Sequence, residues 1–280
     1  MISIFHEQEN RGPGKVVKNL KKGLYQLKID FNENPANINQ SDNILCLQYN
    51  RILESSNLEN FIIGPNICVL PIESSIVMQQ RYKKIITPSK WVFDLYSRWI
   101  DKSKIIIWPV GIDTEFFNDT SSFQKNIDCL IYFKRRNNEE LKFVKELLEK
   151  NNQSYEIIEY GNYDEMKFKN SINNCKYSFV LNGTESQGIA IQEIMSSNLP
   201  LFVWDLEFWL DKGEKFKIES TSVPYWDDIC GIKEIKKENL EDAFVLFLKS
   251  IENYHPRNYI LEELNIEKQA KEIFNNLTNK

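Results

Sequence analysis

Residues 185–200 have the sequence ESQGIAIQEIMSSNLP, which places two carboxylates around the start of a predicted helix. The apolar run YSFVLN at 177–182 precedes this stretch and predicts a buried strand, and Gly188 opens the helical pattern that follows. Glu185 therefore lies in the loop between strand and helix, and Glu193 lies about a turn and a half inside the helix. Because another apolar strand follows, the stretch is typical of the βαβ units of an α/β fold.

The same alternation of short apolar runs and helical patterns extends along the whole chain. Strands are predicted at 2–5, 44–48, 60–64, 84–88, 104–111, 126–133, 155–161, 177–182 and 200–205. Helices are predicted at 15–27, 74–82, 89–100 (capped by Ser89), 138–150, 164–174, 188–197, 236–251 and 258–279. The polar segment 111–126 separates two such series. Two series predict two doubly wound, Rossmann-like domains with parallel sheets.

Composition excludes several classes of protein. The chain of 280 residues has a formal net charge of -5, which argues against nucleic acid as the main partner. No apolar run approaches the ~20 residues that span a bilayer, and the N-terminus turns polar too early for a secretory signal. Five scattered cysteines and two histidines match no zinc spacing. We therefore expect a cytoplasmic protein with reduced thiols and no metal site.

The candidate binding residues are those that follow the predicted strands. In open α/β sheets, ligands bind beyond the carboxyl ends of the strands and near helix N-termini. Glu185, Glu193 and the amides near Gly188 suit a ligand that has both hydroxyls and phosphate, because carboxylates accept hydrogen bonds from sugar hydroxyls. The basic run at 134–136 (Lys-Arg-Arg) follows another strand and suits the phosphate.

Four motifs occur in one order along the chain. They are GPGKVVKNL at 12–20, IITPSKW at 85–91, WPVGID at 108–113 and the E-x7-E pair formed by Glu185 and Glu193. Together they resemble the retaining GT-B glycosyltransferases of the large family-4 type. The resemblance implies two Rossmann-like domains that face a cleft, at 1–117 and 118–255, and a C-terminal helix at 256–280 that packs back on the first domain.

The resemblance also implies a role for individual residues. Glu185 would hydrogen-bond hydroxyls of the donor sugar, and Lys134 and Arg135, with Arg136 behind, would neutralise the diphosphate; Glu185, Lys134 and Arg135 form the catalytic set. Glu193 would accept from both ribose hydroxyls of the nucleotide. The donor-binding set comprises Gly12, Gly14, Gly161, Tyr163, Thr184, Ser186, Gln187, Gly188, Ile189 and Glu193. Of these, the two N-terminal glycines would let backbone approach the diphosphate, and Gly161 and Tyr163 fall where the base is usually held.

The implied function is transfer of a sugar from a nucleoside diphosphate to an acceptor hydroxyl, with retention and without a metal or other cofactor. The expected partners are the nucleotide-sugar donor and an acceptor that is a glycan or a lipid-linked saccharide. The resemblance implies a role in polysaccharide biosynthesis and allows peripheral contact with a membrane. Three alternatives remain: an inverting GT-B transferase with His6 or Glu7 as its base, a non-catalytic nucleotide-sugar-binding protein, and an unrelated receptor of the periplasmic-binding-protein type. The last also has two α/β domains, but the expected lack of a signal sequence argues against it. The sequence departs from the family where Asn198 replaces a glycine, where a second basic position after Arg136 is missing, and where the first domain lacks a histidine near the acceptor.

Overall fold

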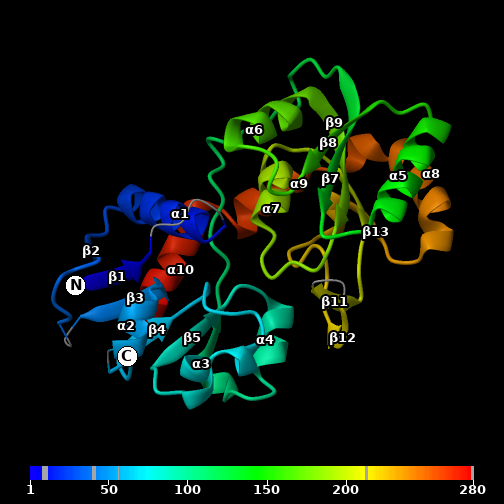
Figure 1. Cartoon of the computed structure of the whole chain (residues 1–280). Coiled ribbons are helices and arrows are strands. Elements are labelled where there is room, and N and C mark those ends of the chain that lie inside the picture. Colours follow the sequence, from blue (N-terminus) through cyan, green and yellow to red (C-terminus); the bar gives the residue numbers. More distant parts are fainter. Residues whose placement is uncertain (8–11, 40–41, 56, 212–213, 279–280) are drawn as a thin grey trace. The chain divides into compact units, whose positions relative to one another are not determined.

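The structure is a computed structural model that describes residues 1–7, 12–39, 42–55, 57–211 and 214–278 (Figure 1). It divides into two compact units. Unit 1 comprises Met1–Gly111 and Leu264–Lys280, and unit 2 comprises Ile112–Glu263. The division after Gly111 falls at the start of the polar segment that separates the two predicted βα series. Each unit contains one parallel sheet with helices, so the predicted α/β class is confirmed.

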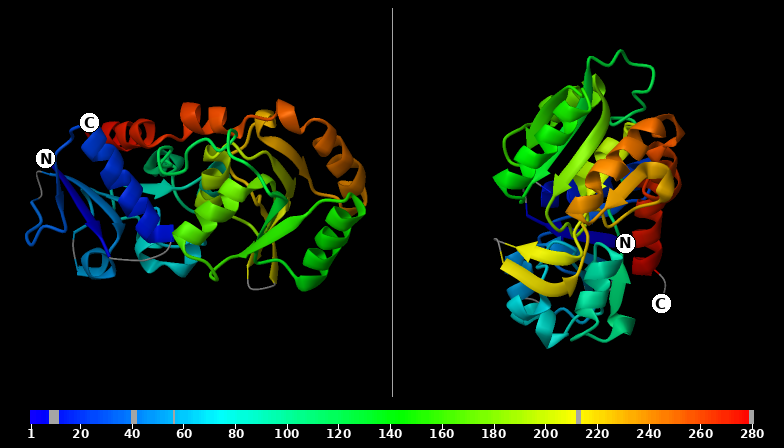
Figure 2. Two further views of the ribbon diagram at one scale, coloured as in Figure 1. Left: turned by 90° about the horizontal axis from the view of Figure 1, so that it is seen from above. Right: turned by 90° about the vertical axis from the view of Figure 1, so that its right-hand side faces the viewer.

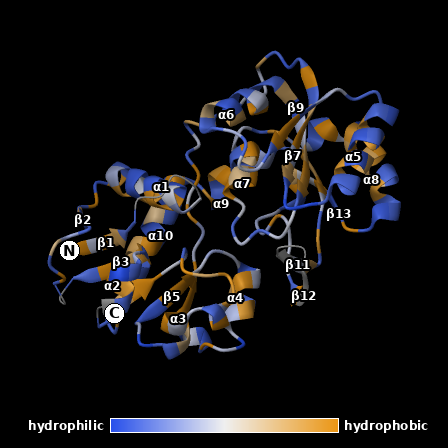
Figure 3. Ribbon diagram, in the orientation of Figure 1, coloured by the Kyte–Doolittle hydropathy of each residue, from blue (hydrophilic) through white to orange (hydrophobic). Residues whose placement is uncertain are grey.

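Unit 1 is built on a six-stranded parallel sheet with the order β2-β1-β3-β4-β5-β6. Its strands are β1 Ile2–His6, β2 Phe31–Glu33, β3 Asn43–Gln48, β4 Phe61–Ile63, β5 Lys84–Thr87 and β6 Ile105–Ile107. Its helices are α1 Gly12–Gln26, α2 Asn50–Ser55, α3 Ser75–Gln79, α4 Lys90–Tyr96 and α10 Ile266–Thr278. Five of these strands are apolar and largely buried, as their short runs of Ile, Leu and Phe predict (Figure 3), whereas the short edge strand β2 is polar and mostly exposed.

The C-terminal helix α10 belongs to unit 1 and lies beside α1 (red and blue in Figures 1 and 2). Its buried face includes Ile266, Ala270 and Ile273, which recur at helical spacing. Gly23 of α1 permits the close approach, because a Cβ there would lie 2.6 Å from the Ala270 Cβ and 2.7 Å from the Ile266 carbonyl oxygen. The prediction that a C-terminal helix packs on the first domain is therefore confirmed.

Gly23→Ala is expected to destabilise unit 1 by about 1–3 kcal/mol, the usual cost of overpacking a close contact. Gly12→Ala is the matched control, because Gly12 lies in the same helix and a Cβ there meets nothing within 4 Å. Urea unfolding of the wild type and both variants measures the difference. Equal midpoints for the two variants would show that α1 and α10 do not pack this closely.

Unit 2 is built on a five-stranded parallel sheet with the order β13-β10-β9-β7-β8. Its strands are β7 Ile127–Lys134, β8 Tyr155–Glu159, β9 Cys175–Asn182, β10 Leu201–Trp204 and β13 Gly231–Glu234, and an antiparallel hairpin of β11 Phe208–Asp211 and β12 Glu214–Glu219 follows β10. Its helices are α5 Asn138–Lys150, α6 Glu165–Asn174, α7 Ile189–Ser196, α8 Leu240–Lys249 and α9 Pro256–Glu263.

Apolar side chains of the helices cover the two faces of this second sheet. On one face, Leu147 of α5 and Phe244 of α8 pack with Phe179 and Phe202 of the strands. On the other face, Phe168 of α6 lies against Tyr132 of β7, with 6.0 Å between the ring centroids. Because both faces of the sheet are covered, the ends of its strands remain open to ligands. In open α/β sheets, ligands bind at the carboxyl ends of the strands.

Several expected elements differ from those observed. The helix expected at 258–279 is two helices, α9 and α10, because Asn265 accepts a hydrogen bond from the Lys268 amide (2.8 Å) and starts a new helix. The helix expected at 74–82 ends at Gln79, since Gln80 adopts a left-handed conformation (φ 52°). Ser89 occupies the N-cap position of α4, as predicted, but its hydroxyl makes no capping hydrogen bond. The elements β2, α2, β11, β12 and β13 were not expected.

Candidate functional site

The strand order of unit 2 creates a crevice between β7 and β9. Numbered in chain order, the five strands run 2-1-3-4-5, so the connections leave β7 and β9 toward opposite faces of the sheet. Lys134 ends β7 and is paired in register with Asn182, which ends β9. The Gly183 amide donates to the Lys134 carbonyl oxygen (2.7 Å) and fixes the two strand ends together. Predicted site residues from two distant stretches therefore meet here.

Lys134 and Glu185 form an ion pair at this crevice. The two side chains are only 11% and 12% exposed, and the Lys134 ammonium contacts Glu185 Oε1 directly. Asn182 Nδ2 also donates to Glu185 Oε1 (3.0 Å), and the Lys134 ammonium lies 4.1 Å from the centroid of the Tyr160 ring. A carboxylate and an aromatic face thus hold the lysine at the carboxyl edge, where it is largely shielded from water.

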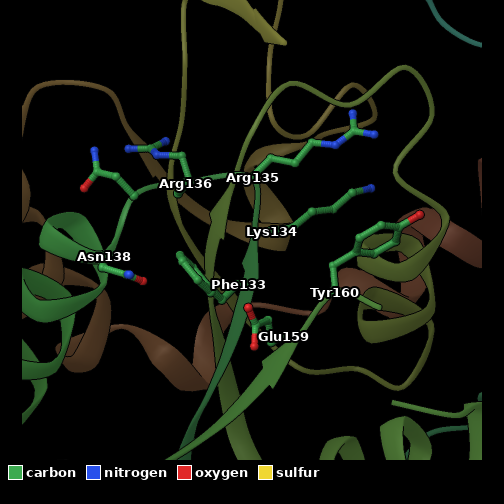
Figure 4. A pocket seen from close by; sticks show the side chains of 8 residues that line it. Phe133, Lys134, Arg135, Arg136, Asn138, Glu159 and Tyr160 are labelled. Carbon is green, nitrogen blue, oxygen red and sulfur yellow. The ribbon is translucent and has the colours of Figure 1, made fainter. Parts of the chain in front are cut away.

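Arg135 and Arg136 differ although they are neighbours in sequence. Arg135 adopts a left-handed backbone conformation (φ 53°), is exposed, and has no ion pair or hydrogen bond in the described part of the chain. The side chain of Arg136 is only 2% exposed, and it donates to both carboxylate oxygens of Glu140 (2.6 and 2.8 Å) and to the Trp204 carbonyl oxygen (3.2 Å). Figure 4 shows Arg136 pointing away from Lys134 and Arg135. Arg136 thus spends most of its donors on partners within unit 2, which leaves Lys134 and Arg135 as the stronger candidates for phosphate, and the expected supporting role of Arg136 stays a prediction.

A pocket of about 460 Å³ adjoins this basic run at the carboxyl ends of β7 and β8 (Figure 4). It is lined by Phe133, Lys134, Arg135, Arg136, Asn137, Asn138, Glu159 and Tyr160. The aromatic and amide groups offer stacking and hydrogen bonds, and the two cations at its rim supply positive charge. This combination suits a planar ligand that carries phosphate.

Glu193 lies in the interior of α7 and is only 2% exposed. Besides burial, the negative charges of Glu193 and Glu185 both help to raise the pKa values of Tyr132 and Tyr163. Burial, together with the charge of Glu193, raises the pKa of Tyr163 to about 12, although a hydrogen bond with Tyr132 opposes the shift. Burial also raises the pKa of Tyr132. Both carboxylates of the E-x7-E motif therefore contribute to raising the pKa values of Tyr132 and Tyr163, and Tyr132 belongs to an apolar strand that gave no sequence signal.

The loop that carries Glu185 is held on both sides. Gly188 adopts φ 76° at the N-cap of α7, a conformation that favours glycine. Thr184 Oγ1 donates to the Phe208 carbonyl oxygen (3.2 Å), and Gln192 Nε2 donates to the Gln187 carbonyl oxygen (2.8 Å). Ser186 is half-buried between these anchors.

The amides of Ile189 and Ala190 begin α7. They have no hydrogen-bond acceptor within the described residues of the chain. At a helix start, such N–H groups are available to an anion or a hydroxyl.

The remaining predicted residues fall in different places. Gly161 follows β8 in unit 2, is exposed and adopts φ 91°. Gly12 and Gly14 belong to unit 1 and form the first turn of α1, so the glycine-rich loop expected there is helical from Gly12 onward. Residues 8–11, which precede them, lie outside the described residues.

His6 ends β1 and is buried. Its Nε2 lies 2.8 Å from Glu33 Oε1 and its Nδ1 lies 3.2 Å from the Glu7 carbonyl oxygen, so both ring nitrogens have partners. Glu7 Oε1 accepts from the Asn50 amide (3.1 Å). These contacts describe a structural histidine and a loop carboxylate, and they give no support to either as the base of an inverting reaction.

No group of three or more His, Cys, Asp or Glu side chains is placed to hold a metal ion among the residues that the structure describes. In the same part of the chain, no helix combines the length and apolarity needed to cross a membrane. All five cysteines are free thiols.

No protein-family model matches this chain, and no curated protein sequence matches it. Several solved structures, in contrast, are similar to this chain. Sucrose-phosphate synthase from Thermosynechococcus elongatus superimposes with a TM-score of 0.60 at 10% identity, covering 98% of this chain and 97% of that one. WaaG, a glycosyltransferase involved in lipopolysaccharide biosynthesis, gives a TM-score of 0.54 at 8% identity and covers both chains fully.

A third similar structure is TarM from S. aureus, in complex with fondaparinux, alpha-GlcNAc-glycerol and UDP. It gives a TM-score of 0.61 at 14% identity and covers 95% of this chain but 59% of TarM. At these identities the likeness concerns the fold. The order of strands in both units, the C-terminal helix on unit 1 and these superpositions agree, and the chain has the GT-B fold.

Proposed function

We propose that this protein is a glycosyltransferase that moves a sugar from a nucleoside diphosphate to an acceptor hydroxyl, with retention of anomeric configuration. The acceptor class we favour is a glycan or lipid-linked saccharide. One observation carries the proposal: Lys134 and Glu185 are paired at the switch point between β7 and β9, and the exposed guanidinium of Arg135 lies beside them. Charge for a diphosphate and a carboxylate for sugar hydroxyls are thus placed at one sheet edge.

The chemistry that we propose is the one that the resemblance to retaining GT-B glycosyltransferases implies, and these placements are compatible with it. The bond between the anomeric carbon and the diphosphate oxygen breaks while the acceptor oxygen bonds the same face of that carbon. The leaving diphosphate takes the acceptor proton, so no protein base is required. Lys134, Arg135 and the amides that begin α7 neutralise the charge that grows on the leaving group. Glu185 accepts hydrogen bonds from sugar hydroxyls and orients the anomeric carbon.

The similar structures support this choice of substrates at the level of class. The TarM structure contains UDP, fondaparinux and alpha-GlcNAc-glycerol, and WaaG is described as a glycosyltransferase. The pocket next to Lys134 has room for a planar base and lies on the same edge as the ion pair. We accordingly assign donor binding to unit 2.

The proposal is tested by turnover. The full chain is incubated with a panel of nucleoside-diphosphate sugars and saccharide acceptors, and release of nucleoside diphosphate is followed. NMR of the product then gives the anomeric configuration. Retention is expected. An inverted product would instead favour the alternative that needs a protein base, and donor binding without turnover on any acceptor would favour a nucleotide-sugar-binding protein.

Sugar transfer is expected to continue in excess EDTA at close to its full rate. The reason is that the two cations and the helix amides supply the positive charge, and the described residues contain no cluster of metal-ligating side chains. A metal-dependent glycosyltransferase assayed in parallel serves as the control for chelation. Loss of activity that only magnesium or manganese restores would contradict this account of the site.

A further inference from the structure

Asp205 is a buried carboxylate that follows β10 and does not itself line the crevice pocket. Its Oδ1 accepts from the amides of Leu206 (2.8 Å) and Ser222 (2.7 Å), and the Thr221 hydroxyl donates to both of its oxygens (2.9 and 2.8 Å). Lys233 lies 3.7 Å from Oδ2. The carboxylate therefore has several donors within its own unit, and two of these four groups belong to the segment 221–222.

The residues that Asp205 holds are in turn bonded to the loop that carries Glu185. The Glu185 amide donates to the Thr221 carbonyl oxygen (3.0 Å), and the Ser222 hydroxyl donates to the Asn182 carbonyl oxygen (3.2 Å). Asn182 also donates to the Glu185 carboxylate. Both ends of the loop from Asn182 to Glu185 are thus tied to residues whose positions Asp205 fixes.

Asp205 also links the two ends of the segment that contains the β11–β12 hairpin. Between Asp205 and Thr221 the chain leaves the sheet, forms the β11–β12 hairpin and returns (Figure 1). The Ser220 amide donates to the Glu207 carbonyl oxygen (3.0 Å), and the Thr184 hydroxyl contacts the Ser220 hydroxyl (3.1 Å). A single carboxylate side chain therefore joins the start and the end of this segment where it meets the Glu185 loop.

We infer that Asp205 is a positioning residue for sugar transfer. By fixing Thr221 and Ser222, it fixes the backbone of the Asn182–Glu185 loop and so the place where the Glu185 carboxylate meets the donor sugar. The inference rests on the proposed function for the role of Glu185, but the hydrogen bonds that link Asp205 to the loop stand without it. Charge-assisted bonds of this kind are strong enough for one carboxylate to order such a loop.

The test compares Asp205→Asn with Asp128→Asn in the full chain. Asp128 accepts from the Ser154 amide (2.8 Å) and hydroxyl (2.6 Å) and pairs with Lys176 (2.7 Å), so it has the same kinds of partner, but near the amino end of β7. Amide hydrogen exchange is measured at Glu185 and Ser222. Transfer is measured with the nucleoside-diphosphate sugar that the wild type turns over fastest.

Asp205→Asn is expected to raise the hydrogen-exchange rates of the Glu185 and Ser222 backbone amides by about tenfold or more. The reason is that the asparagine side chain has one acceptor oxygen and cannot accept from all the donors that the aspartate carboxylate serves. The Asp205→Asn variant is also expected to have a kcat about tenfold or more below that of the wild type, while its KM for the donor changes by less than about threefold. Asp128→Asn is expected to change neither the exchange of these amides nor kcat.

Unchanged exchange at Glu185 and Ser222 in Asp205→Asn would overturn the inference, whatever the activity. Faster exchange with unchanged kcat would overturn the positioning role. If the wild type turns over no donor, the proposed function fails, and the exchange result still decides whether Asp205 orders the loop. Should Asp205→Asn not fold, Thr221→Ala, which removes a hydroxyl that Asp205 holds, is expected to raise exchange at the same amides, and unchanged exchange there would overturn the inference.

Discussion

Replacing Lys134 by methionine is expected to lower the rate of sugar transfer by about 10²–10³-fold, the usual loss when one charge-stabilising donor is removed from an active site. Lys134 is the cation held at the switch point, next to where we place the leaving diphosphate. Lys142→Met is the control, because Lys142 is 77% exposed on α5 and outside the site. Its rate is expected to equal that of the wild type.

The methionine variant also leaves the Glu185 carboxylate largely buried without its cation. Removing one partner of a buried ion pair destabilises a protein by about 3–5 kcal/mol, somewhat less here because both side chains retain some exposure. The double variant Lys134→Met with Glu185→Gln removes the stranded charge and is expected to be more stable than the single variant, yet equally inactive. A double variant with wild-type turnover would eliminate both residues from the reaction.

Glu185→Gln and Glu193→Ala are expected to fail in different ways. Glu185 lies in the loop at the start of α7, where we place the sugar, so its loss should reduce turnover by about 10²-fold and leave nucleoside-diphosphate affinity within about threefold of wild type. Glu193 lies inside α7, where we place the ribose. In Glu193→Ala, the loss of its charge-assisted hydrogen bonds to the ribose, worth about 1.5–3 kcal/mol, should lower the affinity for the free nucleoside diphosphate by about 10–100-fold.

Calorimetry with the free diphosphate and turnover at saturating donor give the two numbers for each variant. Glu193→Gln accompanies Glu193→Ala, because it keeps the volume of a side chain that is buried in a helix. If Glu185→Gln loses the nucleotide but keeps its turnover, the two roles are reversed. If both carboxylates can be replaced without effect on either quantity, the E-x7-E pair has no part in donor binding.

The sequence predicted most of the strands and helices because short apolar runs and helical periodicity are local signals. Both parallel sheets follow from them, since strands that alternate with helices are joined by right-handed crossovers. The hairpin of β11 and β12 was missed although its sequence, FWLDKGEKFKIE at 208–219, has aromatic residues and a glycine turn signal. The break between α9 and α10 was also missed, because it depends on one asparagine cap.

The site was predicted less completely, because its contacts join residues far apart in sequence. Lys134 and Glu185 were each named as candidates, but their ion pair spans 51 positions and has no local signal. Arg135 and Arg136 cannot be distinguished by composition, since their roles depend on the left-handed turn that directs one outward and the other toward Glu140. The network of Asp205 depends likewise on the return of the chain at Thr221.

Titration calorimetry of the full chain with UDP, GDP, ADP, CDP and dTDP tests the central claim most directly. At least one of these diphosphates is expected to bind, and Arg135→Ala and the Lys134→Met with Glu185→Gln double variant are each expected to weaken it by about tenfold or more, as loss of a charged hydrogen bond predicts. Lys142→Met is expected to bind like the wild type. Absence of binding for all five, or binding that neither site variant weakens, would contradict a donor site between β7 and β9.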